Sequence, residues 1–136
     1  MAYQIDVQKT NNSRIETVDF NNIPFGEIFS DHMFVADYRD GEWTDCRIVP
    51  YGALSMEPSN LALHYGQSVF EGMKASKDKN GQTTLYRPEM HAKRINKSAQ
   101  RMCMPAIPED LFLQAVHQLV DLDSKWVPPI KGSALY

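Results

Sequence analysis

The dipeptide Asp40-Gly41, placed between two runs rich in aromatic and branched residues, is the feature that most constrains how this chain can fold. The first run covers 28–38, and the second covers 43–49. Asp-Gly suits a two-residue hairpin turn because both residues adopt a positive φ there at little cost. The sequence therefore predicts an antiparallel pair of strands in its first half.

A second hairpin is predicted further along the chain. Residues 61–75 read as a strand, with a turn at 64–66 as a possible start of its extended part. Residues 83–87 read as its partner. The polar tetrapeptide over 78–81 ends in glycine and supplies the turn between them.

Two helices are expected after the hairpins. Pro88 suits the first turn of a helix that runs to about Met104, with a core stripe of Ile95, Ala99 and Met102. The second helix runs from Glu109 to about Trp126 and starts with acidic residues, which the helix dipole favours. Because the strands precede the helices, the order favours an α+β fold: an antiparallel sheet of hairpins packed with two helices.

The two ends of the chain are read differently from its middle. Residues 1–24 are polar and are predicted to form an extended arm with one short strand at 14–18. Residues 132–136 begin a new apolar stretch, which indicates that the sequence stops at Tyr136 in the middle of a strand.

Composition excludes several classes of function. With 136 residues, 43% hydrophobic content and a net charge of −3, the chain has enough material for one domain and carries no basic stripe for nucleic acid. It has neither a signal-peptide pattern nor an apolar run of membrane-spanning length, so we expect a soluble, cytoplasmic protein. Cys46 and Cys103 lack metal-binding spacing; a disulfide is the alternative, but we expect reduced thiols and no metal site.

Arg94 is the most informative single position. On the predicted helix it shares a face with His91, Ser98 and Arg101. A planar guanidinium suits bidentate contact with a phosphate or a carboxylate. A solvated basic face is the alternative, and spacing alone leaves both open.

The apolar run over 64–74 contains the other candidates. Tyr65 and Phe70 are candidates for a ligand pocket, although their odd spacing puts them on opposite faces of a regular strand and leaves core packing open. Glu71 is unusual in such a run unless it faces solvent. Lys74 is the only local lysine that could react with a carbonyl cofactor. The residues alone suggest an anion-binding α+β domain without a complete catalytic set.

From Phe25 to Tyr136 the chain also resembles the N-terminal domain of branched-chain amino acid aminotransferases, which are pyridoxal phosphate enzymes of fold-type IV. The resemblance is carried, in order and with family spacing, by residues 25–26, 29–33, 63–75, 85–88, 91–94, 98–99, 101–102, 104–105, 119–120, 123, 126–128 and 133–136. It implies that residues 1–24 are an arm and that 25–136 form the small N-terminal domain, truncated before a C-terminal domain.

The resemblance also implies residue roles. Arg94 matches the arginine that holds the cofactor phosphate. Tyr65, Phe70 and Tyr136 match aromatic residues that line the pocket for the substrate side chain, and Glu71 is expected to support that pocket. Lys74 does not match the catalytic position and is withdrawn as a candidate.

The implied reaction moves an amino group from leucine, isoleucine or valine to 2-oxoglutarate, giving glutamate and a branched 2-oxo acid. The resemblance places the cofactor-binding lysine beyond residue 136, so we expect this piece alone to be inactive and the full-length protein to be a homodimer. D-amino acid aminotransferases and aminodeoxychorismate lyases share the fold and remain alternatives. A free-standing domain that serves only binding or oligomerisation is a third.

Overall fold

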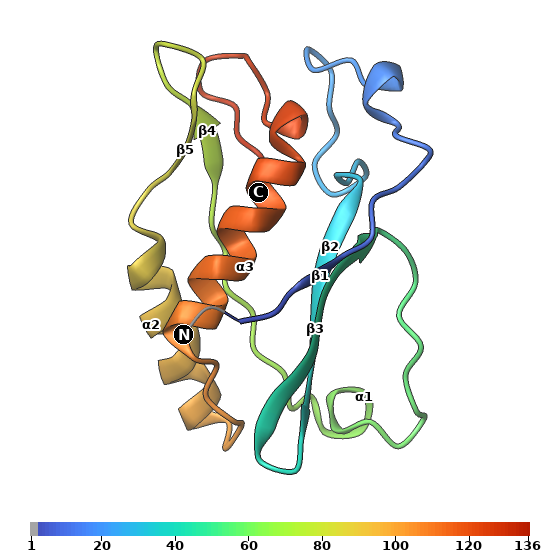
Figure 1. Cartoon of the computed structure of the whole chain (residues 1–136), viewed down its shortest axis with the longest axis vertical. Coiled ribbons are helices and arrows are strands. Elements are labelled where there is room, and N and C mark those ends of the chain that lie inside the picture. Colours follow the sequence, from blue (N-terminus) through green and yellow to red (C-terminus); the bar gives the residue numbers. More distant parts are fainter. Residues whose placement is uncertain (1–2) are drawn as a thin grey trace.

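The computed structural model describes residues 3–136, and it is an α+β domain as predicted. Figure 1 shows helix α3 (Glu109–Leu122) in the middle, with one hairpin sheet on one side and helix α2 (Pro88–Arg101) with a second hairpin on the other. Helix α3 packs against both strand β2 (His32–Arg39) and α2. The central helix is therefore the element that joins the two halves.

The first hairpin is confirmed. Strand β2 pairs antiparallel with β3 (Glu42–Pro50), from His32 opposite Pro50 to Arg39 opposite Glu42. Asp40 and Gly41 have φ values of 52° and 89°, the positive values that the predicted turn requires.

The second hairpin is also confirmed, but its strands are short. Strand β4 (Ala75–Lys77) pairs antiparallel with β5 (Thr83–Leu85). The two hairpins belong to separate sheets, so the prediction of one continuous sheet was wrong. Leu135 forms an antiparallel bridge with Ala75, and the last apolar residues therefore do extend this small sheet.

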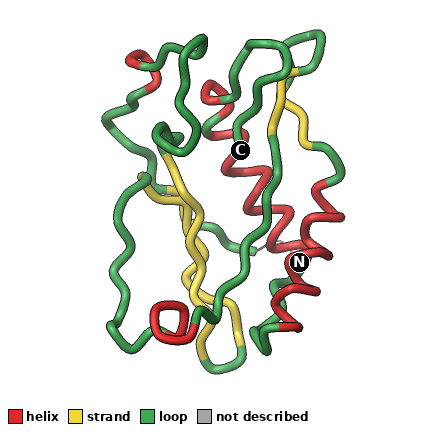
Figure 2. The backbone as a smooth tube through the Cα atoms, turned by 180° about the vertical axis from the view of Figure 1, so that it is seen from behind, coloured by secondary structure: helices red, strands yellow, loops and turns green. Residues whose placement is uncertain are grey.

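The prediction of a strand over 61–75 was wrong. Leu61–Tyr65 forms the short helix α1, and the chain from 66 to 74 has no regular structure before β4 begins. The Asn60 side chain caps this helix by accepting from the Ala62 N–H at 2.8 Å, and Gly66 ends it with a φ of 63°. These capping contacts favour a helix at Leu61–Tyr65 despite the strand-like composition. Figure 2 draws the chain that follows this helix as a loop.

The N-terminal arm is less extended than predicted. Residues Asp6–Val7 form strand β1, which adds to β3 in parallel. The short strand expected at 14–18 was wrong, because Ile15–Thr17 is a 3-10 helix. The Thr17 hydroxyl donates to the Arg14 carbonyl at 2.7 Å, and this contact favours a turn over a strand.

Both long helices form where the sequence predicts them, although they end earlier. The turn beyond α3 is a separate 3-10 helix, Ser124–Trp126. On α2 the buried residues are Ala92 and Ala99, while Met102 is exposed, so the predicted core stripe is only partly correct.

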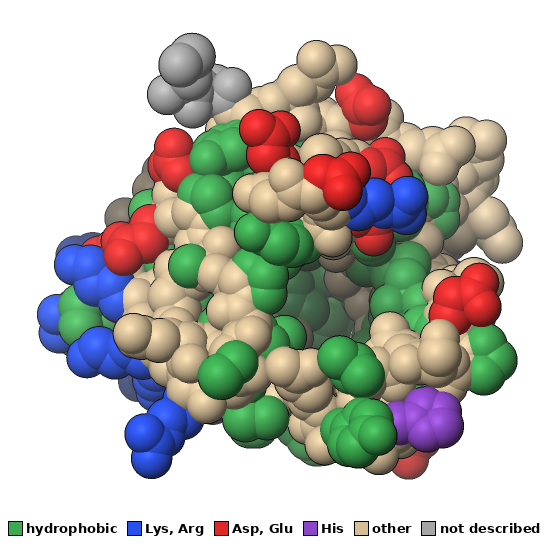
Figure 3. Space-filling view, turned by 90° about the horizontal axis from the view of Figure 1, so that it is seen from below, with side chains coloured by type: hydrophobic (Ala, Val, Ile, Leu, Met, Phe, Trp, Pro, Cys, Tyr) green, Lys and Arg blue, Asp and Glu red, His purple; other side chains and the backbone are tan. Residues whose placement is uncertain are grey.

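The largest fully buried side chains are Ile48, Leu111 and Val127. Two apolar grooves of about 180 and 280 Å³ meet at Val116 and Leu119 on α3. Figure 3 shows a hollow lined by hydrophobic side chains between the two halves.

Within residues 3–136, no helix combines the length and the hydrophobicity that a membrane crossing needs.

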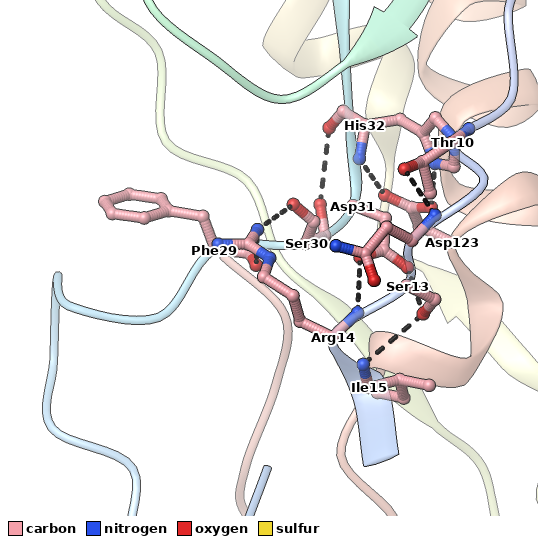
Figure 4. A network of polar contacts seen from close by, with 10 residues as sticks. Thr10, Ser13, Arg14, Ile15, Phe29, Ser30, Asp31, His32 and Asp123 are labelled. Atoms are coloured by element: carbon pink, nitrogen blue, oxygen red, sulfur yellow. Dashed lines mark hydrogen bonds and ion pairs between the residues drawn. The ribbon is translucent and has the colours of Figure 1, made fainter. Parts of the chain in front are cut away.

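A buried polar network fastens the arm to the domain (Figure 4). Asp31 accepts from the Ser13 hydroxyl at 2.5 Å and from the Arg14 amide at 3.2 Å. The Arg14 guanidinium donates to the carbonyls of Phe29 and Ser30. Burial of the Asp31 carboxylate opposes its ionisation, but hydrogen bonds, led by that of Ser13, lower its pKa.

The same network continues to the end of α3. His32 lies with its Nδ1 2.6 Å from Asp123 Oδ1, and the His32 amide donates to Asp123 Oδ2 at 2.9 Å. The Thr10 amide donates to His32 Nε2 at 2.9 Å. Since Nε2 accepts, Nδ1 carries the proton and donates to Asp123. The arm, the start of β2 and the end of α3 are thus joined at one point.

Candidate functional site

The candidate site is built where α2 faces the irregular segment that precedes β4. The i, i+3 spacing places His91 and Arg94 on one side of α2, and Glu71 reaches them from the facing loop. Arg94 Nε donates to Glu71 Oε2 at 2.7 Å, and Arg94 Nη2 donates to Glu71 Oε1. His91 Nδ1 lies 3.0 Å from Glu71 Oε1. We call these three residues the Glu71 cluster.

Ionisation of the cluster follows from these contacts. The pKa of Glu71 is lowered to about 2, and the hydrogen bonds from Arg94 are the largest cause. The contact with His91 lowers this pKa further, whereas burial of the carboxylate opposes the shift. The same pairing raises the pKa of Arg94. Because an ionised carboxylate can only accept, His91 Nδ1 is the donor in its contact with Glu71.

The arginine keeps donors for a further ligand. Glu71 engages the Nε side of the guanidinium, so both N–H groups of Nη1 and one of Nη2 remain free of it. The Arg94 side chain is 64% exposed, whereas that of Glu71 is only 5% exposed. Arg94 lines a shallow cavity of about 390 Å³, together with Arg87, Lys93 and Lys97. This surface suits a small anion such as a phosphate.

The predicted aromatic residues are exposed, and the structure brings only some of them near one another. Phe70 is 85% exposed although it directly precedes the buried Glu71. Tyr136 lies 6.0 Å from Phe25, centroid to centroid, and its ring closely approaches Gly72. Tyr65 is 82% exposed at the end of α1, and Figures 1 and 2 place α1 at the end of the molecule away from the C-terminus. Among the described residues, Tyr65 makes no ring contact with Phe70 or Tyr136.

A side chain at position 72 would require the ring of Tyr136 to move. A Cβ there would lie 2.8 Å from Tyr136 Oη and 3.0 Å from Tyr136 Cε2. The absence of a side chain therefore lets Tyr136 lie directly over the segment that carries Phe70 and Glu71.

Lys74 does not join the Glu71 cluster. It borders one of the apolar grooves along α3, together with Met73 and Tyr136, and its side chain is exposed. Cys46 is buried and Cys103 is exposed, and both are free thiols.

Sequence reasoning missed three parts of this arrangement. It grouped His91 with Arg94 by spacing, but it did not connect either residue with Glu71. It gave no role to Gly72, and it did not foresee the network of Asp31, His32 and Asp123. The adjacent Glu71 and Gly72 in an apolar run were the available signal for the cluster and for the close approach of Tyr136. No local signal pointed to the network around His32.

No family model matches this chain. It is 47% identical to branched-chain-amino-acid transaminase 1 of Bacillus subtilis over 122 residues, covering 89% of this chain and 34% of that protein. Identity with branched-chain-amino-acid aminotransferase 2 of the same organism is 46%, covering 87% of this chain and 33% of that protein. The branched-chain-amino-acid aminotransferase of Mycolicibacterium smegmatis is 42% identical, with 82% of this chain and 30% of that protein covered.

The chain thus spans about a third of the length of the curated relatives that it matches. The aligned part nevertheless covers more than four fifths of the chain and is identical at more than two residues in five. By its sequence, this chain is homologous to the branched-chain-amino-acid aminotransferases.

Proposed function

We propose that this chain is the small domain of a branched-chain aminotransferase of fold-type IV that uses pyridoxal phosphate. The reaction transfers the amino group of leucine, isoleucine or valine to 2-oxoglutarate. One observation carries the proposal: the segment over 70–72 combines an exposed aromatic ring, a buried carboxylate that grips Arg94, and a glycine against Tyr136. Homology over more than four fifths of the chain supports it.

Arg94 would hold the phosphate of the cofactor. It lines a cavity with three further cationic side chains and keeps N–H groups that Glu71 does not use, and charge-assisted hydrogen bonds from such groups suit a phosphate dianion. When bound, pyridoxal phosphate supplies the electron sink for breaking bonds at the α-carbon of the amino acid. In this proposal the described residues would hold the cofactor by its phosphate only, and Lys93 and Lys97 would add positive charge to the cavity.

Phe70 and Tyr136 would contribute to the wall of the substrate pocket. Branched aliphatic side chains differ from other amino-acid side chains by bulk without polarity, and aromatic rings are suitable receptors for them. We also assign Tyr65 to this wall, although in this chain it lies at the end of α1. The exposure of these rings leaves them free to contact a ligand or a further part of the protein.

The whole protein would be a cytoplasmic homodimer in which residues 1–24 form an arm and residues 25–136 form the small domain. In this proposal the lysine that bonds the cofactor lies beyond residue 136, so we expect the 136-residue chain alone to be catalytically inactive. D-amino acid aminotransferases and aminodeoxychorismate lyases are the competing activities on the same fold.

The test uses the complete protein that contains this chain, supplied with pyridoxal phosphate. We expect glutamate to form from 2-oxoglutarate when leucine, isoleucine or valine is the donor, and not when D-alanine is. We expect borohydride to attach the cofactor to a lysine outside residues 1–136. Glutamate formation only with D-alanine, or reductive labelling of Lys74, would overturn the proposal.

A further inference from the structure

We propose that Glu71 is a positioning residue for anion binding: it fixes the Arg94 guanidinium so that the unpaired N–H groups of Arg94 point at the phosphate of the cofactor. This inference rests on the proposed role of Arg94. In this role Glu71 does not contact the cofactor. It orients Arg94, which does.

The geometry of the pair supports a fixed orientation. Both carboxylate oxygens of Glu71 are used by Arg94, one for Nε at 2.7 Å and the other for Nη2. Two parallel hydrogen bonds fix the plane of a guanidinium as well as its position. Among the described residues, Glu71 is the only side chain that an ion pair joins to Arg94.

The two partners differ in exposure, and this difference indicates which of them holds the other. Glu71 is 5% exposed, and its neighbour Gly72 lies under the ring of Tyr136. Arg94 is 64% exposed and has a long side chain that would otherwise sample many rotamers. The buried carboxylate is therefore the anchor, and the exposed guanidinium is the group that it holds in place. An arginine that is already oriented loses less conformational entropy when an anion binds.

Charge alone predicts the opposite effect of Glu71. A carboxylate beside an anion site repels the anion, so replacing it by a neutral amide should strengthen binding if electrostatics were its only influence. If Glu71 positions Arg94, the same replacement should weaken binding. The sign of the change therefore separates the two roles.

The experiment measures how strongly the complete protein, freed of cofactor, binds pyridoxal phosphate compared with pyridoxal, which lacks the phosphate. Three variants are needed: Arg94→Gln, Glu71→Gln and the double variant. We expect Arg94→Gln to reduce the preference for the phosphorylated form by about tenfold or more, as the loss of a charge-assisted pair implies. We expect Glu71→Gln to reduce it by about threefold to tenfold, and the double variant to match Arg94→Gln alone.

Each other outcome points to a specific failure. If Arg94→Gln leaves the preference unchanged, the proposed phosphate site is wrong. If Arg94→Gln lowers the preference while Glu71→Gln raises it or leaves it unchanged, the phosphate site stands and the positioning role is wrong. If Glu71→Gln still lowers the preference when Arg94 is already replaced, Glu71 acts by another route and the positioning role is again wrong.

Matched controls and a second measurement guard against misfolding. Glu42→Gln makes the same chemical change at an exposed carboxylate at the start of β3, and Arg39→Gln removes an exposed arginine at the end of β2. Both should keep the preference of the parent protein. In the 136-residue chain, nitrogen-15 NMR should show slow exchange of the Arg94 Nε–H with water, and Glu71→Gln should make this exchange fast. Equally fast exchange in both chains would contradict the positioning role without any cofactor being present.

Discussion

The molecule contains two histidine–carboxylate pairs, and they differ in what surrounds them. His32 Nδ1 lies 2.6 Å from Asp123, and the two side chains are only 6% and 3% exposed. His91 Nδ1 lies 3.0 Å from Glu71, and the histidine of this pair is 21% exposed. The same two chemical groups are thus sealed in one place and open to solvent at one side in the other.

The pairs also differ in the hydrogen-bonding capacity that they leave free. In the first pair, His32 Nε2 accepts from the Thr10 amide, and the second oxygen of Asp123 accepts from the His32 amide. In the second pair, both oxygens of Glu71 accept from Arg94, which has further N–H donors and lines a cavity. A closed network fixes the chain to itself, whereas an open network offers donors to a ligand. We therefore expect a structural role for the first pair and propose a binding role for the second.

The largest effect is expected from breaking the sealed pair. Asp123→Ala removes the acceptor of the buried His32 Nδ1–H and of the His32 amide. Buried donors without a partner are costly, so we expect a loss of about 2–4 kcal/mol in the free energy of unfolding. Urea denaturation of the 136-residue chain measures it.

The control for this variant is Asp121→Ala, which removes an exposed carboxylate from the last turn of the same helix. It should change the free energy of unfolding by less than about 0.5 kcal/mol, as exposed substitutions usually do. Equal effects of the two variants would mean that the His32–Asp123 pair contributes nothing particular to the fold.

The parts of the fold that the sequence predicted are those with local causes. Asp40-Gly41 dictates its turn through the backbone preferences of two adjacent residues, and Pro88 marks the start of α2. The strand predicted over 61–75 failed because composition was weighed above the cap at Asn60. Strand β1 was missed because it forms only by adding to β3, some 40 residues away in the sequence.

The candidate site divides in the same way. The shared face of His91 and Arg94 follows from their i, i+3 spacing on a helix, and this spacing can be read directly from the sequence. Their contacts with Glu71 join positions 20 and 23 residues apart, and the contact of His32 with Asp123 joins positions 91 apart. Such contacts depend on how the elements pack, and no pattern within one element encodes them.

The open pair should contribute a smaller, pH-dependent stabilisation. The pKa of Glu71 is lowered from 4.5 to about 2, so the ionised carboxylate is favoured by the folded state. This contribution is fully present above pH 4.5 and is lost as the pH falls towards 2. Since Arg94 is 64% exposed and solvent screens the pair, we expect only about 1–2 kcal/mol.

The measurement compares the parent chain with Glu71→Gln by urea denaturation at pH 7, 4.5 and 3. The difference in free energy of unfolding should shrink as the pH falls. Glu89→Gln serves as the control for stability. In the parent chain Glu89 contacts Arg87 across 3.8 Å at the surface, and the variant should show no such trend. A constant difference between the parent and Glu71→Gln would mean that the Glu71–Arg94 pair does not stabilise the ionised carboxylate in the folded chain.

The smallest effect should come from replacing the histidine of the open pair. His91→Gln removes the third contact of Glu71, but Arg94 still engages both oxygens, so no buried acceptor is left without a partner. We expect the free energy of unfolding to fall by about 0.5 kcal/mol, a typical net value for one hydrogen bond. The matched variant His32→Gln leaves the Thr10 amide and Asp123 to find new partners in a buried site and should cost several times more. Since both variants make the same replacement, equal losses would erase the distinction between a sealed and an open pair, and a larger loss for His91→Gln would reverse it.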